Sequence, residues 1–188
     1  MILQPRLVSV NLAREGTVRY GTLLVRTGIF KEPAAGRVRL RGLGLDGDFQ
    51  ADPSVHGGPD KAAYAYPSEH YPYFRKLLGR EDLPYGFFGE NFTTEGLLED
   101  GVRVGDVLRV GTALVRVTTP RSPCFKLGAK AGSPAFVAAF LRSRRLGFYL
   151  AVVEEGEVGA GDEIRLVSSD AGAPTLARVI EEKYFSGE

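Results

Sequence analysis

The amino-acid sequence predicts a mainly β protein, a many-stranded sheet or β-barrel with a few short peripheral α-helices. Short apolar stretches rich in valine, leucine and tyrosine recur between glycine and proline turns along most of the chain. This pattern is typical of barrels, in which the strands are short and the turns between them are tight. The 188 residues fit one such domain with a short appendage better than they fit two domains.

Eight segments are expected to form strands: residues 7–11, 20–25, 37–41, 62–66, 107–110, 113–118, 148–153 and 163–167. In the third segment Val38 and Leu40 alternate with arginines, so one face of that strand should be buried and the other exposed. Gly111-Thr112 joins the fifth and sixth segments. A two-residue linker with glycine first is typical of a type II′ hairpin turn.

Three helices are expected: residues 68–78, 135–146 and 175–184. Ser133 and Pro134 provide a cap and a proline at the start of the second helix, and Gly147 would end it. Leu176, Val179 and Ile180 fall at helical spacing in the third helix. Their apolar stripe should be covered either by the protein's own surface or by a second copy in a homodimer.

Composition and charge exclude several classes of protein. Lysine and arginine total 24 against 23 for aspartate and glutamate, so no global charge attracts nucleic acid or an anionic membrane. No apolar run approaches the roughly 18 to 20 residues that cross a bilayer, and the N-terminal segment lacks the apolar core of a secretory signal. A single cysteine, Cys124, cannot form an intrachain disulfide, an iron–sulfur cluster or a four-thiolate zinc site. We expect a cytoplasmic protein that binds neither nucleic acid nor membrane.

Residues 42–47 match the G-x-G-x-x-G pattern of dinucleotide-binding proteins and follow a predicted strand. A dinucleotide site needs a helix to begin at that loop, so that the helix N-terminus can hold the pyrophosphate. Here Pro53 and the pair Gly57-Gly58 follow, and they cannot continue such a helix. We therefore reject a dinucleotide cofactor.

A glycine-rich loop over residues 45–61 gathers polar side chains: Asp46, Asp48, Asp52, His56, Asp60 and Lys61. The aspartates either rim a site or close turns through the backbone. His56 lies among glycines that offer it little packing, so a functional and a structural role are both open. Lys61 points either into a pocket or toward solvent.

Glu90-Asn91 lies between a glycine and an aromatic residue. An amide and a carboxylate can recognise the polar edge of a heterocycle, or they can simply fix a turn.

The sharpest feature of the sequence is the segment around Cys124. Pro120 and Pro123 rigidify a short loop at the end of a predicted strand, and Arg121 and Lys126 flank the thiol. Cationic neighbours favour the thiolate, the form that attacks, carries sulfur or binds a soft metal. The alternative is an inert, buried cysteine that packs like a small apolar residue.

Taken together, these segments resemble the MOSC family, named for the C-terminal domain of molybdenum-cofactor sulfurases, and most of all its small stand-alone YiiM-like bacterial branch. The match is carried by residues 44–48, 51–52, 56–58, 60–61, 64–73, 89–95, 104–106, 120–121, 123–124 and 126–127. The resemblance implies a MOSC-type β-barrel domain over residues 1–170, followed by a C-terminal helix over residues 171–188. That helix would be a truncated form of the longer helical tail found in the branch, and no second β-barrel domain would precede the MOSC domain.

The resemblance also implies an activity. Cys124 would ligate molybdenum in the molybdenum cofactor (molybdopterin), and the protein would reduce N-hydroxylated bases with electrons from an external donor protein. Arg121, Lys61 or Lys126 would lie near the cofactor's phosphate, while His56, Glu90 and Asn91 would line the pocket. Pyridoxal phosphate binding and a role in detoxification are further properties that the resemblance implies.

Three other functions remain open at this point. Cys124 could carry sulfur as a persulfide for the assembly of a metal–sulfur cofactor, without reductase turnover. The protein could instead bind a nucleotide-like heterocycle, with a merely structural thiol. A zinc hydrolase using His56, Asp46, Asp48 and Cys124 is disfavoured, because the spacing of these residues matches no standard zinc signature.

Overall fold

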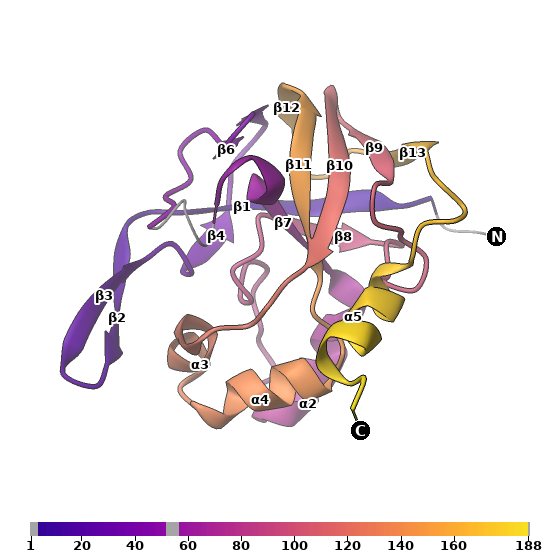
Figure 1. The fold of residues 1–188 in the computed structure, drawn as a ribbon. Helices are drawn as coiled ribbons and strands as arrows, with labels where there is room; N and C mark the ends of the chain where they lie inside the picture. Colours follow the sequence, from indigo (N-terminus) through magenta and orange to yellow (C-terminus); the bar gives the residue numbers. More distant parts are fainter. Residues whose placement is uncertain (1–3, 52–56, 188) are drawn as a thin grey trace.

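The computed structural model describes residues 4–51 and 57–187, and most of its regular structure is β-strand (Figure 1). The strands are β1 (Arg6–Ala13), β2 (Gly16–Tyr20), β3 (Leu23–Thr27), β4 (Lys31–Pro33), β5 (Val38–Arg41), β6 (Gly44–Leu45), β7 (Ala63–Pro67), β8 (Phe92–Glu95), β9 (Val107–Val110), β10 (Ala113–Pro120), β11 (Phe148–Glu154), β12 (Gly156–Val158) and β13 (Ile164–Ser168). The α-helices are α2 (Tyr71–Leu78), α3 (Phe125–Ala131), α4 (Ala135–Arg142) and α5 (Leu176–Tyr184), with short 3-10 turns at Pro59–Lys61 and Ser68–His70. The predicted mainly β class is confirmed.

The main sheet has eight strands in the order β13-β9-β10-β11-β7-β8-β1-β4. Its neighbours pair antiparallel except β7 and β8, which are parallel. The strand ladder does not close, so the predicted barrel is only approximate. The ends of the sheet nevertheless approach each other, because Arg6 of β1 forms an isolated bridge with Glu163, next to β13. Leu7 extends this link by donating its N–H to the carbonyl of Asp162 at 2.8 Å.

Two smaller sheets flank the main one. β12, β5 and β6 form a three-stranded sheet, and β2 pairs with β3 in a hairpin that projects from the body of the protein (Figure 1). The alternation predicted for the 37–41 segment is confirmed, since Val38 and Leu40 are buried while Arg39 and Arg41 are exposed. Residues 42–47 form the turn into β6 and β6 itself, which is not the strand-to-helix geometry of a dinucleotide site.

Several elements differ from the sequence prediction. Residues 20–25 were expected to form one strand, but Gly21-Thr22 breaks that segment into the turn between β2 and β3. The expected helix over residues 135–146 ends at Arg142, and Arg144 just beyond it adopts a positive φ of 61°. Strands β4, β6, β8 and β12 and helix α3 were not predicted.

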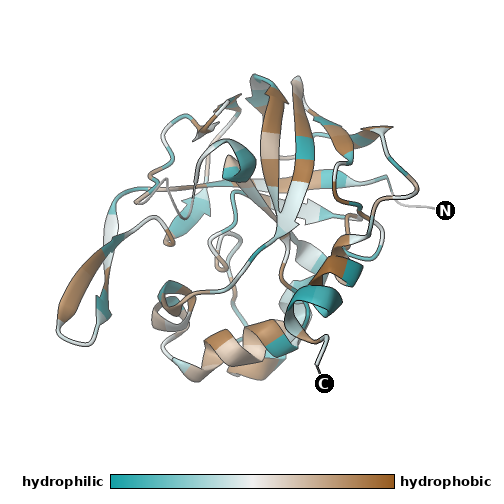
Figure 2. Cartoon of the chain, in the orientation of Figure 1, coloured by the Kyte–Doolittle hydropathy of each residue, from teal (hydrophilic) through white to brown (hydrophobic). Residues whose placement is uncertain are grey.

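The core has two parts. Apolar side chains of the main sheet, among them Val115, Phe148 and Leu150, form the first part. The second is an aromatic cluster between β7 and the helices, in which Tyr66 and Phe140 are fully buried. Figure 2 shows α4 as largely hydrophobic, as a helix that covers this cluster should be.

Helix α5 packs on its own chain. In the stripe identified in the sequence, Leu176 and Ile180 are 0% and 1% exposed, and Val179 is partly buried. The stripe is therefore covered without a second copy. Within residues 4–51 and 57–187, no helix combines the length and the apolar composition that crossing a bilayer requires.

Two glycines at equivalent places in two hairpin turns provide a matched test of packing. Gly111 and Gly21 are each the first residue of a two-residue turn, with φ of 56° and 59°. A Cβ on Gly111 would lie 2.3 Å from the carbonyl oxygen of Glu157, whereas a Cβ on Gly21 would meet nothing within 4 Å. The two sites thus differ in the room they leave for a Cβ atom, while both have a backbone conformation that strains an L-residue.

We expect Gly21→Ala to lower the free energy of unfolding by about 1–2 kcal/mol, the cost of a left-handed conformation for an L-residue. Gly111→Ala should cost about 1–3 kcal/mol more, because its Cβ also collides with the backbone that covers the turn. Urea unfolding of both variants measures the difference. Equal losses would show that the contact between Gly111 and Glu157 is not close in solution.

Candidate functional site

A pocket opens where the ends of β3, β7, β10 and β11 meet the start of helix α3. Six of the residues singled out in the sequence line it: Asp48, Lys61, Asn91, Arg121, Cys124 and Lys126. The fold therefore gathers side chains that are up to 78 residues apart in the chain, from Asp48 to Lys126. His56 lies outside the described residues.

Cys124 is positioned by the element that the sequence analysis missed. It is the residue immediately before α3, with an extended backbone (φ −133°, ψ 171°), and its side chain is half-buried. Lys130, in the last turn of the helix, donates hydrogen bonds from Nζ to the carbonyls of Ile29 (2.8 Å) and Gly86 (2.7 Å). These bonds hold the helix that carries Cys124 against the opposite side of the pocket, where Ile29 is part of the lining.

Arg121 brings a buried positive charge to the pocket. The residue is 6% exposed, and its Nη1 donates to the carbonyl of Phe88 at 2.5 Å and to the hydroxyl of Tyr64 at 3.4 Å. The guanidinium also lies 4.8 Å from the centroid of the Tyr64 ring. All of these partners are neutral, so an anion in the pocket would find a guanidinium that no contacting carboxylate has already neutralised.

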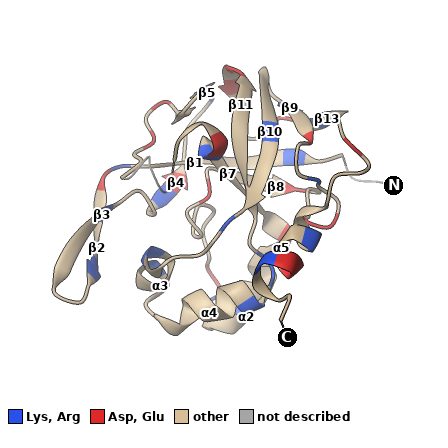
Figure 3. Ribbon diagram, in the orientation of Figure 1, with Lys and Arg blue, Asp and Glu red and all other residues tan. Residues whose placement is uncertain are grey.

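The lining carries more positive than negative charge. Among the described residues of the lining, Lys31, Lys61, Arg121 and Lys126 face a single carboxylate, that of Asp48. Figure 3 shows basic residues on α3, on the segment between β10 and α3 and on β4. The ammonium of Lys61 lies 5.7 Å from the centroid of the Tyr149 ring, another lining residue. The electrostatics of the pocket therefore favour an anionic ligand.

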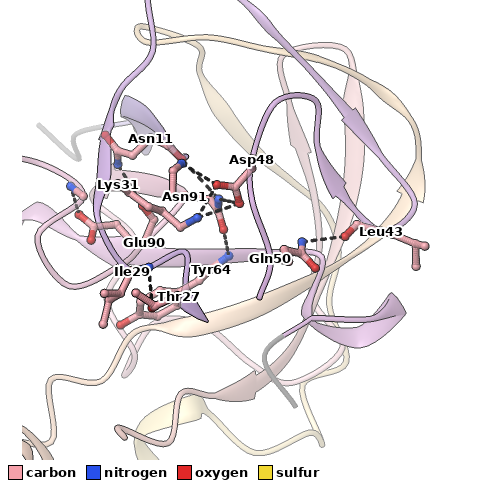
Figure 4. A network of polar contacts seen from close by, with 12 residues as sticks. Asn11, Thr27, Ile29, Lys31, Leu43, Asp48, Gln50, Tyr64, Glu90 and Asn91 are labelled. Carbon is pink, nitrogen blue, oxygen red and sulfur yellow. Dashed lines mark hydrogen bonds and ion pairs between the residues drawn. The ribbon is translucent and has the colours of Figure 1, made fainter. Parts of the chain in front are cut away.

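The wall formed by β4 and the segment before β8 is a buried hydrogen-bonded network (Figure 4). Asp48 accepts bonds from Nζ of Lys31 (2.6 and 2.7 Å), from Nδ2 of Asn91 (2.8 Å) and from the backbone N–H of Ala13 (2.8 Å). The side chains of Lys31 and Asp48 are 7% and 2% exposed. Lys31 was not identified from the sequence, because it lies in a short strand with no motif around it.

Asn91 lines the pocket, but its amide is used within the protein. Oδ1 accepts from the N–H of Tyr64 at 3.1 Å, while Nδ2 donates to Asp48 and to the carbonyl of Asn11. This arrangement favours the structural alternative for Asn91 over recognition of a heterocycle.

Glu90 lies behind the wall of the pocket and is fully buried. Its Oε1 accepts from the hydroxyls of Tyr71 and Thr93 and from the N–H of Gly86, while Oε2 has no partner among the described residues. Burial raises the pKa of Glu90. Burial also lowers the pKa of Lys130 to about 8, although the nearby Glu90 opposes that shift.

The other polar candidates that the structure describes do not form a metal centre. Asp46 pairs with Arg41 at 2.6 Å on the surface, and Asp48 pairs with Lys31. In the part of the chain that the structure describes, no three histidine, cysteine or acidic side chains come together as metal ligands. The described residues therefore give no support to a zinc hydrolase.

Comparison with known proteins places this chain in a family. The sequence is 44% identical over 161 residues to the uncharacterised protein YflK of Bacillus subtilis, spanning 86% of this chain and 72% of YflK. It is 40% identical over 142 residues to the protein YiiM of Escherichia coli, spanning 74% of this chain and 63% of YiiM. It is also 33% identical over 159 residues to a protein of Gibberella moniliformis named as a reductase, but it spans only 28% of that longer protein and 82% of this chain.

Solved structures agree with the sequence relatives. The crystal structure of YiiM from Geobacillus stearothermophilus superposes with a TM-score of 0.80 at 36% identity, covering 96% of this chain and 84% of that one. YiiM from Escherichia coli superposes with a TM-score of 0.68 at 31% identity, covering 88% and 74%. The sequence model of the MOSC domain matches residues 52–165, the region that supplies Cys124, Arg121 and Lys126. The chain therefore belongs to the MOSC domain family.

Proposed function

We propose that this protein binds the molybdenum cofactor with Cys124 as a ligand of molybdenum, and that it reduces N-hydroxylated bases or related N-hydroxylated compounds. The observation that carries the proposal is the composition of one pocket. It combines the single thiol of the chain with the cationic side chains of Lys31, Lys61, Arg121 and Lys126.

The pocket residues fit such a group chemically. A thiolate is a soft, anionic metal ligand. The buried guanidinium of Arg121 suits a phosphate, because it presents several N–H donors in one plane and keeps its charge when buried. Lys61 and Lys126, which also line the pocket, would add positive charge near the same anion.

When bound, the cofactor would supply oxidation–reduction chemistry at its metal. The protein would orient it and shape the space beside it. Electrons would come from an external donor protein, because the one cysteine of the chain cannot hold an iron–sulfur cluster as well. The relative named as a reductase supports reductive chemistry, although this chain spans only 28% of it.

A reactive single thiol functions best in a reducing compartment, so we propose the cytoplasm as the place of action. A homodimer and a role in detoxification stay proposals of the same kind. Neither the comparisons nor the geometry supports pyridoxal phosphate binding, and the proposal does not include it.

The first prediction concerns the thiol. Protein purified from a host that makes the molybdenum cofactor should contain near-stoichiometric molybdenum, and Cys124→Ser should lose most of it, since a hydroxyl is a much poorer ligand for a soft metal. Elemental analysis measures the metal, and the melting temperature should stay within a few degrees because the side chain is half-buried and similar in size. Absence of metal, together with a sulfur adduct on Cys124 in the intact mass, would instead establish the sulfur-carrier alternative.

The second prediction concerns the cationic lining. Lys126→Gln should weaken retention of the anionic cofactor on the order of fivefold, a typical loss for one charge-assisted contact at a partly exposed site. The measurement is the molybdenum content after gel filtration at low and at high salt. Lys76→Gln on the exposed face of α2 removes the same charge away from the pocket and serves as the control. Equal losses in the two variants would rule out a local contact.

A further inference from the structure

The network around Asp48 leaves one kind of donor facing the pocket. Asn91 uses its oxygen and both amide hydrogens within the protein, at Tyr64, Asp48 and Asn11. The two oxygens of Asp48 accept four bonds, which fill the lone-pair positions of a carboxylate.

Lys31 is the exception. An ammonium has three N–H donors, and Asp48 takes at most two of them. At least one N–H therefore has no partner among the described residues, and the side chain that carries it lines the pocket that contains Cys124. Of the three side chains Asp48, Asn91 and Lys31, it is therefore the ammonium of Lys31 that has a donor left for a ligand.

The surroundings of Lys31 suit proton donation. Burial lowers the pKa of the ammonium, while the carboxylate of Asp48 opposes that shift. The other charged groups that act on Lys31 are Glu90, which favours the ammonium, and Arg121 and Lys130, which disfavour it. A lysine that holds its proton less tightly than usual is a better general acid.

We propose that Lys31 is the proton donor to the leaving oxygen when the N–O bond of the substrate is cleaved. This inference rests on the proposed function. The reaction is R–NHOH + 2e⁻ + 2H⁺ → R–NH₂ + H₂O, with both electrons supplied by the external donor protein. As the N–O bond takes up the electron pair and breaks, the leaving oxygen receives a proton from Nζ of Lys31 and departs as water. The second proton, from solvent, goes to nitrogen, and water then reprotonates the amine of Lys31 beside Asp48.

The test uses two variants of the cofactor-loaded protein. Lys31→Arg keeps the positive charge next to Asp48 but does not release a proton near neutral pH. Its kcat for reduction of an N-hydroxylated purine should fall by a hundredfold or more, the usual range for loss of a general acid, with molybdenum content and KM within about threefold of wild type. Lys31→Ala should regain part of its kcat when small alkylamines are added. Lys76→Arg on α2 is the matched control and should behave as wild type.

A readout that does not involve turnover comes from the protein without cofactor. In protein labelled with ¹³C at the lysine side chains, the Lys31 signal, assigned by its loss in Lys31→Arg, should titrate below the ordinary lysine value of about 10.4. In the loaded wild type, kcat should decline toward alkaline pH as Lys31 loses its proton. The Lys31→Arg variant should lack that decline.

The outcomes separate the two proposals. Wild-type protein that contains molybdenum but reduces no N-hydroxylated compound would overturn the proposed function and this inference with it. Active wild type together with Lys31→Arg at near-normal kcat would overturn the inference alone. So would an ordinary titration of Lys31 combined with no rescue of Lys31→Ala by amines, because a purely structural lysine behaves in that way.

Discussion

A carboxylate buried away from water must be paired and hydrogen-bonded, and the burial of Asp48 imposes this requirement on one whole side of the pocket. Its partners come from three parts of the chain: Ala13 at the end of β1, Lys31 on β4 and Asn91 before β8. Asn91 in turn accepts a hydrogen bond from the backbone N–H of Tyr64 in β7, which extends the network to that strand. A single charged group therefore fixes the position of the glycine-rich loop relative to the edge of the main sheet.

The other side of the pocket is organised by positive charge. Arg121 is buried among aromatic rings and backbone carbonyls, where the guanidinium keeps its charge and gains cation–π contacts. Lys130 spans from α3 to Ile29 and Gly86, and its lowered pKa reports how strongly burial opposes a charge there. These cations are fixed before any ligand arrives. An anion of matching shape would bind without having to order them first.

The sequence was most informative where one short-range rule decides the structure. The turn at Gly111 was predicted because glycine suits that turn, and the segment of Cys124 was singled out by its prolines and charges. Contacts between residues distant in the sequence could not be predicted. Lys31, for example, pairs with Asp48, 17 positions away, and no local pattern indicates that pair. Glu90 and Asn91 were treated together, yet only Asn91 lines the pocket, because the carboxylate of Glu90 bonds instead to Tyr71 and Thr93.

The two walls of the pocket differ in whether their residues lie inside the region that the MOSC model matches. The MOSC model begins at residue 52, so it contains Cys124, Arg121 and Lys126 but neither Lys31 nor Asp48. The residues that would hold a cofactor thus belong to the matched region, while Lys31 and Asp48 come from β4 and the loop after β6, before that region begins. A reaction needs both a bound electron carrier and a group that handles the substrate's leaving oxygen. Under the proposed function the two tasks would fall to separate stretches of chain, which the hydrogen bond between Asp48 and Asn91 joins.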